Sequence, residues 1–236
     1  MADHGHSSEE IRARLDALRG SGHLRDAIYG GIDGSVTTFA IVAGVAGAGL
    51  SPFVIVALGL ANVLADGFSM AAGNYSGTKA ELDNARRLRQ IEEDHLRRFP
   101  EGEKRELREI LRNKGLSGDT LEAATEEISH DRERWIAMMM EGEYGVGELE
   151  PHPMRAALVT FVAFLVAGMI PLLPFIFSVP NAFGVSAFLT FAVFFVIGAA
   201  KSRWSLASWW KSGGETLLIG GIAAAIAYFV GTLFHG

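Results

Sequence analysis

Long apolar segments and charged segments alternate along the chain. From Ala27 to Tyr75 only Asp33 and Asp66 carry charge, and from Ala156 to Ala200 no residue does. A helix needs about 20 apolar residues to cross the hydrocarbon core of a bilayer, so each segment is long enough for two crossings. A further apolar segment runs from about Glu215 to Phe234. The pattern predicts an all-α integral membrane protein with five transmembrane helices.

The charged segment between the second and third predicted spans has the pattern of a helical insert, residues 78–153. Its first helix continues from the second span and stops at Pro100, because proline lacks a backbone donor and disfavours a helical residue before it. Its second helix ends at Gly115. A third region runs from about Ser117 to near Gly145, as one helix or as two shorter ones.

Basic residues are distributed unevenly among the loops. Four arginines precede the first span, 14 Lys or Arg lie between Lys79 and Arg155, and three lie between the last two spans. Because basic loops stay in the cytoplasm, the N-terminus and the insert are predicted to be cytoplasmic. The predicted parts are an N-terminal tail with a short amphipathic helix (1–26), two spans (27–77), a cytoplasmic three-helix metal-binding insert (78–153) and three spans (154–236).

The residue composition and the absence of one motif exclude several classes of protein function. The chain contains no cysteine, which excludes disulfides and thiolate metal sites. It contains no glycine-rich loop of the GxxxxGK[ST] type, which argues against an ATP-driven pump. The net charge of -6 sits mostly on the insert, which suits cations as partners and not nucleic acid.

Polar residues form a stripe on the second predicted span. Asn62, Asp66, Met70 and Asn74 recur at a spacing of four and therefore share one helix face. A carboxylate inside a bilayer costs several kcal/mol unless it faces protein, water or a cation, and such residues mark ion or proton pathways. A thioether beside carboxylates favours a transition metal such as Fe²⁺ or Mn²⁺ over Mg²⁺ or Ca²⁺.

The first predicted span repeats this pattern with Asp33. Together the two spans predict a translocation path formed by Asp33, Asn62, Asp66 and Met70. Gly30 and Gly34 have the small-xxx-small spacing that lets helices approach closely, and we interpret them as packing residues.

The insert carries a second set of candidate ligands. Glu92 and His95 lie one helical turn apart, as in di-iron carboxylate bundles. Three consecutive methionines are poorly explained as core residues, because consecutive positions point around a helix. The alternative is an ordinary solvated domain whose carboxylates form exposed ion pairs. The candidate metal ligands are Glu92, His95, Glu103, Glu106, Met139, Met140 and Glu143.

Several motifs, in order, resemble the vacuolar iron transporter family. The resemblance covers Tyr29 to Gly231, nearly the whole chain. The motifs are YGGIDGSVTTFAIVAG, ADGFSMAAGNYSGTKAE, WIAMMMEGEYG, GMIPLLPF and LLIGGIAAAIAYFVG.

The resemblance implies a homodimer in the lipid membrane, with the path between the first and second spans of both copies and a cytoplasmic metal-binding domain. Members move Fe²⁺, and often Mn²⁺ or other divalent ions, out of the cytosol in exchange for protons. The family's path aspartate and methionine match Asp33 and Met70, and its cytoplasmic ligands match Glu92, Glu103, Glu106, Met139, Met140 and Glu143. Plant members have glutamate where this chain has Asn62, and the family has glutamate where this chain has His95.

The resulting expectation is a transporter of Fe²⁺, with Mn²⁺, Zn²⁺ and Co²⁺ as further candidate ions, and not an enzyme. We expect a bacterial inner membrane in preference to a vacuolar one. The competing interpretations are a membrane-anchored ferritin-like iron-binding or ferroxidase protein, and a metal sensor or storage protein.

Overall fold

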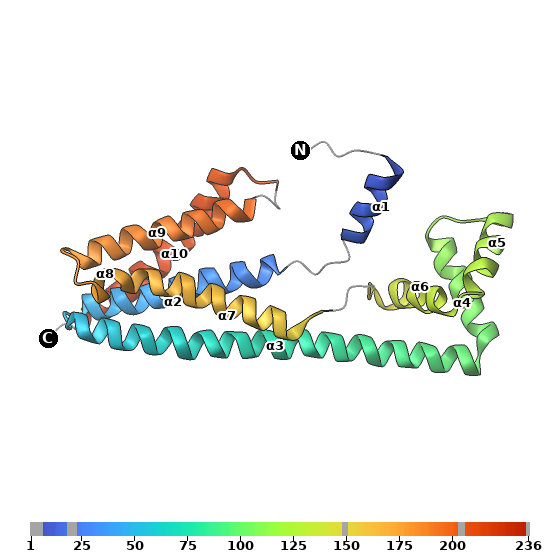
Figure 1. Cartoon of the computed structure of the whole chain (residues 1–236), viewed down its shortest axis with the longest axis horizontal. Coiled ribbons are helices and arrows are strands. Elements are labelled where there is room, and N and C mark those ends of the chain that lie inside the picture. Colours follow the sequence, from blue (N-terminus) through green and yellow to red (C-terminus); the bar gives the residue numbers. More distant parts are fainter. Residues whose placement is uncertain (1–6, 18–22, 148–150, 203–205, 235–236) are drawn as a thin grey trace. The chain divides into compact units, whose positions relative to one another are not determined.

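The computed structural model describes residues 7–17, 23–147, 151–202 and 206–234. The described residues form helices and connecting turns, without strands. They divide into two compact units. The membrane unit comprises residues 22–77 and 153–236, and the insert comprises residues 78–152 together with the N-terminal helix α1 (Ser8–Ala17). Helix α3 (Pro52–Arg98) contributes its first half to the membrane unit and its second half to the insert (Figure 1).

Five helices among the described residues are long and apolar enough to cross a membrane, which confirms the predicted all-α membrane fold. The fifth begins at Trp209, earlier than the start predicted near Glu215. The membrane-unit helices are α2 (Leu24–Gly47), α3, α7 (Pro153–Met169), the short η1 (Ile170–Leu172) and α8 (Leu173–Ile176), α9 (Ala182–Lys201) and α10 (Trp209–Thr232).

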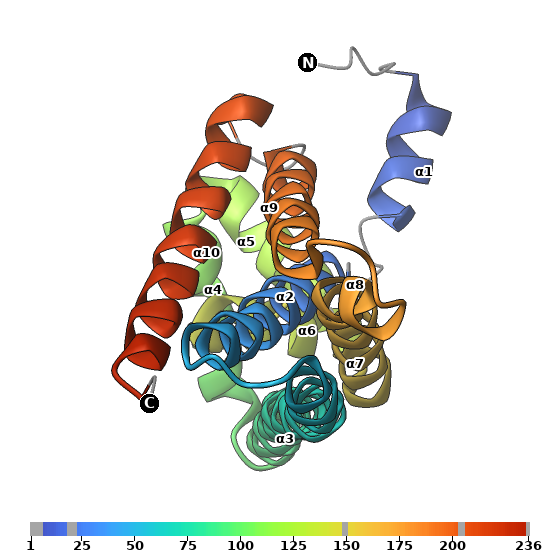
Figure 2. The same cartoon turned by 90° about the vertical axis from the view of Figure 1, so that its left-hand side faces the viewer.

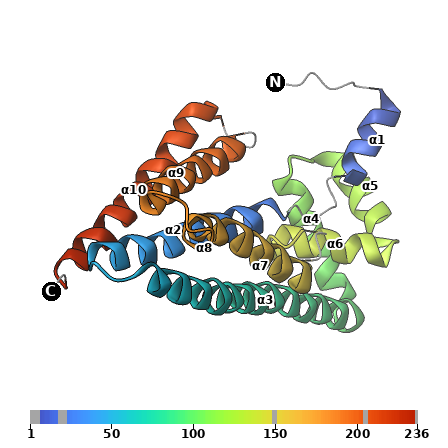
Figure 3. The same ribbon diagram turned by 60° about the vertical axis from the view of Figure 1, so that its left-hand side comes forward.

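Helix α2 is the central helix of the membrane unit. It packs along α7, α9 and α10, which surround it in the end-on view of Figure 2. Half of its most apolar 18-residue window is buried, against 22% for the corresponding windows of α3, α9 and α10. Helices α9 and α10 also pack against each other (Figure 3). The path residue predicted on α2 is therefore carried by the best-enclosed span.

Glycines let the membrane helices approach at backbone distance. A Cβ added at Gly30 would lie 2.3 Å from the backbone oxygen of Thr160, and one at Gly231 would lie 2.1 Å from that of Gly44. Neither position has room for a methyl group. Gly34 makes a similar contact with α7, so the interpretation of Gly30 and Gly34 as packing residues is confirmed.

The third span ends irregularly because it contains two prolines. Pro171 lies in the 3₁₀ turn η1 and Pro174 in α8, and each lacks the N–H needed to continue the α-helical ladder. The chain then reverses through Ser178 and Asn181, both with positive φ. Helix α9 follows directly.

The insert consists of the second half of α3 followed by α4 (Pro100–Asn113), α5 (Gly118–Ser129) and α6 (Arg132–Tyr144). The third region of the insert is thus two helices, one of the two alternatives that the sequence left open. Asp131 caps α6, because its side chain accepts hydrogen bonds from the backbone N–H groups of Glu133 and Arg134. Gly145 ends α6 with φ +67°.

The insert has a conventional apolar core of large side chains: Leu107, Leu111, Leu121, Trp135 and Met139. Met140 is also buried, and Met138 packs against this core. Two of the three consecutive methionines are therefore buried and Met138 is only partly buried, which agrees with the argument that all three cannot bury, although Met139 is a core residue. Helix α6 packs against both α4 and α5, so more than one of its faces is covered.

Helix α1 begins with a capping box. The Ser7 hydroxyl accepts from the backbone N–H of Glu10, and the Glu10 carboxylate accepts from the backbone N–H of Ser7.

Candidate metal centre and membrane path

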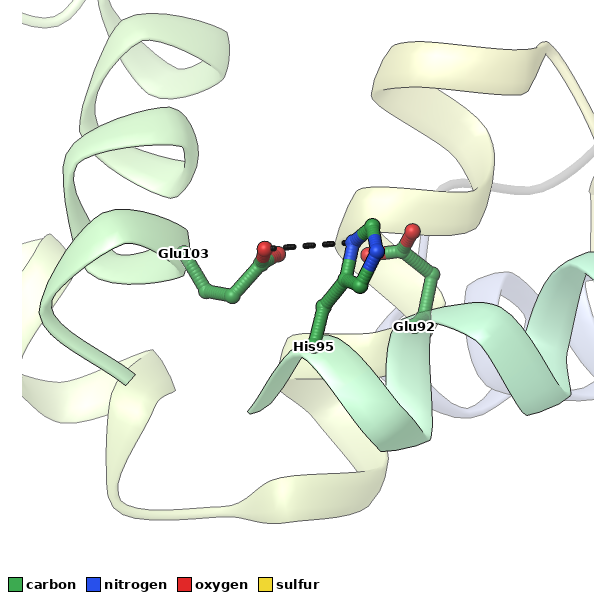
Figure 4. Close-up of side chains that lie close together, drawn as sticks. All are labelled: Glu92, His95 and Glu103. Atoms are coloured by element: carbon green, nitrogen blue, oxygen red, sulfur yellow. Dashed lines mark ion pairs between the residues drawn. The ribbon is translucent and has the colours of Figure 1, made fainter. Parts of the chain in front are cut away.

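Three predicted ligands come together in the insert. Glu92 and His95 lie near the C-terminal end of α3, and Glu103 lies in the first turn of α4. The chain turns between these helices at Phe99 and Pro100, so that the first turn of α4 lies near the end of α3 (Figure 4). One ligand atom from each residue lies within 4.8 Å of those of the other two (Figure 4). We call these three residues the triad.

The two triad carboxylates are buried, and each has an oxygen atom without a hydrogen-bond partner among the described residues. Glu92 is fully buried and Glu103 is 4% exposed, yet the Oε2 atom of each has no hydrogen-bond partner among the described residues. A buried carboxylate oxygen without a partner costs free energy, which a bound cation removes. His95 lies at the exposed rim, with Nδ1 3.5 Å from Glu103 Oε1. Two carboxylates and an imidazole fit a divalent transition metal.

Other carboxylates of the insert behave differently. Glu122 pairs with Arg108, and Glu141 pairs with Lys114 at 2.7 Å, in exposed ion pairs. These pairs match the solvated-domain alternative, and such pairs contribute little to stability. Within the described residues, the Glu92 and Glu103 carboxylates form no ion pair with a lysine or an arginine. The triad is therefore not explained by surface charge pairing.

Burial, together with the neighbouring carboxylates of Glu106 and Glu92, raises the pKa of Glu103 to about 7, while His95 opposes the shift. Burial also raises the pKa of Glu143. A carboxyl group that holds a proton near neutral pH exchanges that proton readily for a metal ion.

The remaining predicted ligands surround the triad less closely. Glu106 and Glu143 are exposed and line a cavity of about 510 Å³ between α4 and α6, together with Glu109. Met139 lies within the apolar core and Met140 is buried beside it.

Sequence reasoning missed Tyr144. Its hydroxyl donates a hydrogen bond of 2.8 Å to Glu92 Oε1. Burial and this contact raise the pKa of the Tyr144 hydroxyl, so it stays a donor. Hydrogen bonds to ligating carboxylates orient them for the metal. Its position in the sequence could have indicated this role, because Tyr144 directly follows the candidate ligand Glu143 in the last turn of the methionine-rich helix α6.

In the membrane unit, the predicted path residues lie on facing sides of α2 and α3. Asn62 Nδ2 donates to Thr37 Oγ1 at 3.4 Å, and Thr37 Oγ1 donates to the backbone oxygen of Asp33 at 2.8 Å. Asp33 and Asp66 lie close enough to interact electrostatically. Asp33 is half-buried, whereas Asp66 is exposed on α3 of the single chain.

Met70 lies further along the same face of α3. It is half-buried and lines a separate cavity near the start of α2. The structure thus brings Asp33, Asn62 and Asp66 together and places Met70 one turn beyond Asp66.

Comparison with known proteins agrees with this architecture. Residues 24–232 match the VIT family. The chain is 37% identical to a vacuolar iron transporter of Toxoplasma gondii, over 91% of this chain and 75% of that protein. It is 32% identical to vacuolar iron transporter 1 of Eucalyptus grandis, over 87% of this chain and 84% of that protein, and 31% identical to vacuolar iron transporter 1 of Arabidopsis thaliana, over 87% and 83%. The chain therefore belongs to the VIT family, the family of the vacuolar iron transporters.

Proposed function

We propose that the protein transports Fe²⁺, with Mn²⁺ as a second substrate, out of the cytosol in exchange for protons. The observation that carries this proposal is the meeting of Asp33 and Asp66 on facing sides of two membrane-spanning helices. Two carboxylates in that position bind a divalent cation or two protons, but not both at once. If the pair releases the cation on the far side of the membrane and releases protons on the cytosolic side, the two are exchanged.

The exposure of Asp66 supports a homodimer. In one copy Asp66 is exposed, although it lies close enough to Asp33 of α2 to interact with it electrostatically. A carboxylate facing lipid costs several kcal/mol, so this face needs protein or water against it. A second copy packed on the same face encloses both aspartate pairs in one path.

The insert captures the ion before transport. The unpartnered oxygens of Glu92 and Glu103 accept the cation, and Glu103 releases its proton on binding. Glu106, Met139, Met140 and Glu143 are proposed as further ligands around the triad. Zn²⁺ and Co²⁺ also suit this donor set.

The distribution of basic residues supports a cytoplasmic N-terminus and insert. The expectation of a bacterial inner membrane is not supported by the three relatives named above, which come from eukaryotes and are named for the vacuole.

A second candidate function is a ferroxidase anchored by its spans, favoured by the Glu–His–Glu composition of the triad. A simple anchor does not need Asp33 and Asp66. We therefore propose that the protein is not an enzyme. Oxygen consumption on addition of Fe²⁺ to the full chain would contradict this.

Transport is tested with purified protein in proteoliposomes that contain a pH-sensitive dye. We expect Fe²⁺ entry coupled to proton exit, reduced to background in Asp33→Ala. Asp83→Asn is the matched control, because Asp83 is an exposed residue of α3 in the insert that pairs with Lys79 at 2.8 Å. Metal that binds without entering the vesicles, or full uptake by Asp33→Ala, would contradict the proposal.

A further inference from the structure

A cavity of about 390 Å³ lies between α2, α3 and α7, outside the triad. Of its lining residues, only Met70 belongs to the predicted path. The cavity is lined by Arg25, Asp26, Tyr29, Met70, Gly73, Asn74 and Thr160.

Asn74 holds the Asp26 carboxylate in place. Its amide nitrogen Nδ2 donates to Asp26 Oδ1 at 2.9 Å and to Thr160 Oγ1 at 2.7 Å, with a longer contact of 3.4 Å to the backbone oxygen of Ala156. One side chain of α3 therefore ties α2 to α7. The Asp26 side chain is only 17% exposed, so its carboxylate has a defined orientation in a largely dehydrated place.

His23 provides a nitrogen beside this carboxylate. Its Nδ1 lies 3.1 Å from Asp26 Oδ2, and its side chain is 25% exposed. Two ligand atoms that each bind one ion at about 2.1 Å, at right angles, lie about 3 Å apart. The pair is thus spaced to share an ion with little rearrangement.

The Met70 thioether adds a sulfur atom to the lining of the cavity, which also contains Asp26. Nitrogen, oxygen and sulfur donors together favour a first-row transition metal over Mg²⁺ or Ca²⁺, which prefer oxygen ligands throughout. Arg25 also lines the cavity, but both it and Tyr29 are exposed, and its guanidinium lies over the Tyr29 ring, 5.6 Å from the centroid. Its positive charge is held at the rim by this cation–π contact.

The cavity continues the series of contacts between α2 and α3. Asn62 meets Thr37, Asp66 lies near Asp33, and Asn74 meets Asp26. Along both antiparallel helices, these contacts follow one another at steps of four to eight residues. The cavity therefore lies at the end of the path on the side where α2 begins.

We propose that this cavity is a loading site, in which Asp26 and Met70 from the lining, with His23 beside Asp26, bind a divalent transition-metal ion before it reaches Asp33 and Asp66. The assignment to the path rests on the proposed function. Binding of the ion itself is measurable without transport.

The absence of cysteine allows a direct test on the full chain. Gly73→Cys places a thiol in the cavity, and Gly77→Cys places one a turn further along α3, outside its lining; a Cβ at either position meets nothing within 4 Å. The rate of maleimide labelling is measured in nanodiscs with increasing Mn²⁺. At ten times the dissociation constant we expect labelling of Gly73→Cys to slow by about tenfold, and that of Gly77→Cys to stay unchanged.

The ligand assignment is tested by adding Asp26→Asn or the control Asp83→Asn to Gly73→Cys. Asp26→Asn should abolish the protection by Mn²⁺, and Asp83→Asn should preserve it, while both keep the metal-free labelling rate of Gly73→Cys. Equal slowing of both cysteines, or protection that survives Asp26→Asn, would overturn the proposal. If Asp26→Asn changes the labelling rate without metal, His23→Gln is tested in its place. His23→Gln must then abolish the protection of Gly73→Cys by Mn²⁺.

The experiments can contradict the proposed loading site and the proposed transport function independently. Protection of Gly73→Cys without metal entry into proteoliposomes would leave the site and remove the proposed function. Proton-coupled entry without protection would leave the function and remove the site.

Discussion

The insert and the membrane unit pack by opposite means. The insert buries large apolar side chains such as Leu107, Leu111 and Trp135 and exposes charge. The membrane unit brings backbones together at glycines and exposes large apolar side chains such as Phe53 and Phe68. Water drives apolar side chains inward, whereas lipid does not, so contact between membrane helices depends on close van der Waals approach.

The two units also hold their carboxylates differently. Glu92 and Glu103 are buried in a domain that faces water, at a cost in stability that a metal ion can remove. Asp33 is half-buried and Asp66 is exposed in the single chain, on the face where we propose that a second copy packs. Under the proposed function, this difference suits an insert that holds an ion and a membrane unit that passes one on.

The largest expected effect comes from breaking the glycine contacts. A Cβ at Gly34 would lie 2.5 Å from the backbone oxygen of Phe164, whereas one at Gly77 meets nothing within 4 Å. We expect Gly34→Leu to destabilise the membrane unit by about 3 kcal/mol or more and Gly77→Leu to be neutral or stabilising. Thermal unfolding in detergent checks this. Similar melting temperatures for the two variants would contradict packing through glycine.

Removing a triad carboxylate should separate function from stability. We expect Glu103→Gln to weaken metal binding by more than about 100-fold, beyond the usual effect of outer-shell partners. The same change should stabilise the metal-free insert at pH 8 by up to about 3 kcal/mol, because a pKa raised from 4.5 to about 7 reflects a penalty on the charged form. Calorimetric titration with Mn²⁺ and urea unfolding measure the two effects.

The control for Glu103→Gln is Glu101→Gln, an exposed carboxylate in the same first turn of α4. It should change neither quantity. Unaltered metal affinity in Glu103→Gln would remove Glu103 from the site.

The stability of the metal-free insert should fall as pH rises from about 4.5 to 7. In this range the folded state keeps a proton on Glu103 that the unfolded chain has lost, so unfolding becomes easier as pH increases. The contribution of Glu103 to the free energy of unfolding is complete below pH 4.5 and is lost as the pH rises through about 7. Metal affinity should change in the opposite direction, because the ion competes with the proton.

Trp135 reports this transition, since it lies in the insert core and the chain's other three tryptophans can be replaced by phenylalanine. Urea unfolding is followed by its fluorescence at each pH. Glu103→Gln should flatten the slope, and an equally steep slope in that variant would assign the effect to another group.

A smaller effect is expected from Tyr144→Phe. This substitution removes the hydroxyl that donates to Glu92 and leaves the ring in place. Metal affinity should fall by about tenfold, with little change in the stability of the metal-free insert. Calorimetric titration checks it, and wild-type affinity would show that Glu92 needs no orienting partner.

Hydropathy alone determined the five spans, because the length and polarity of a crossing segment are local properties that the bilayer imposes. Local helix geometry likewise determined that Glu92 and His95 share a face, and that Asn62, Asp66 and Met70 form a stripe. Breaks at Pro100 and Gly115 followed from the backbone limits of proline and glycine.

Only the tertiary structure decided how these faces meet. The approach of Glu103 to Glu92, the hydrogen bond from Tyr144, the burial of Met139 and the contact between Asn74 and Asp26 all join residues of different helices. Such contacts depend on the angles and distances at which helices pack, and those follow from side-chain volumes across the whole unit. No period within a single helix encodes them.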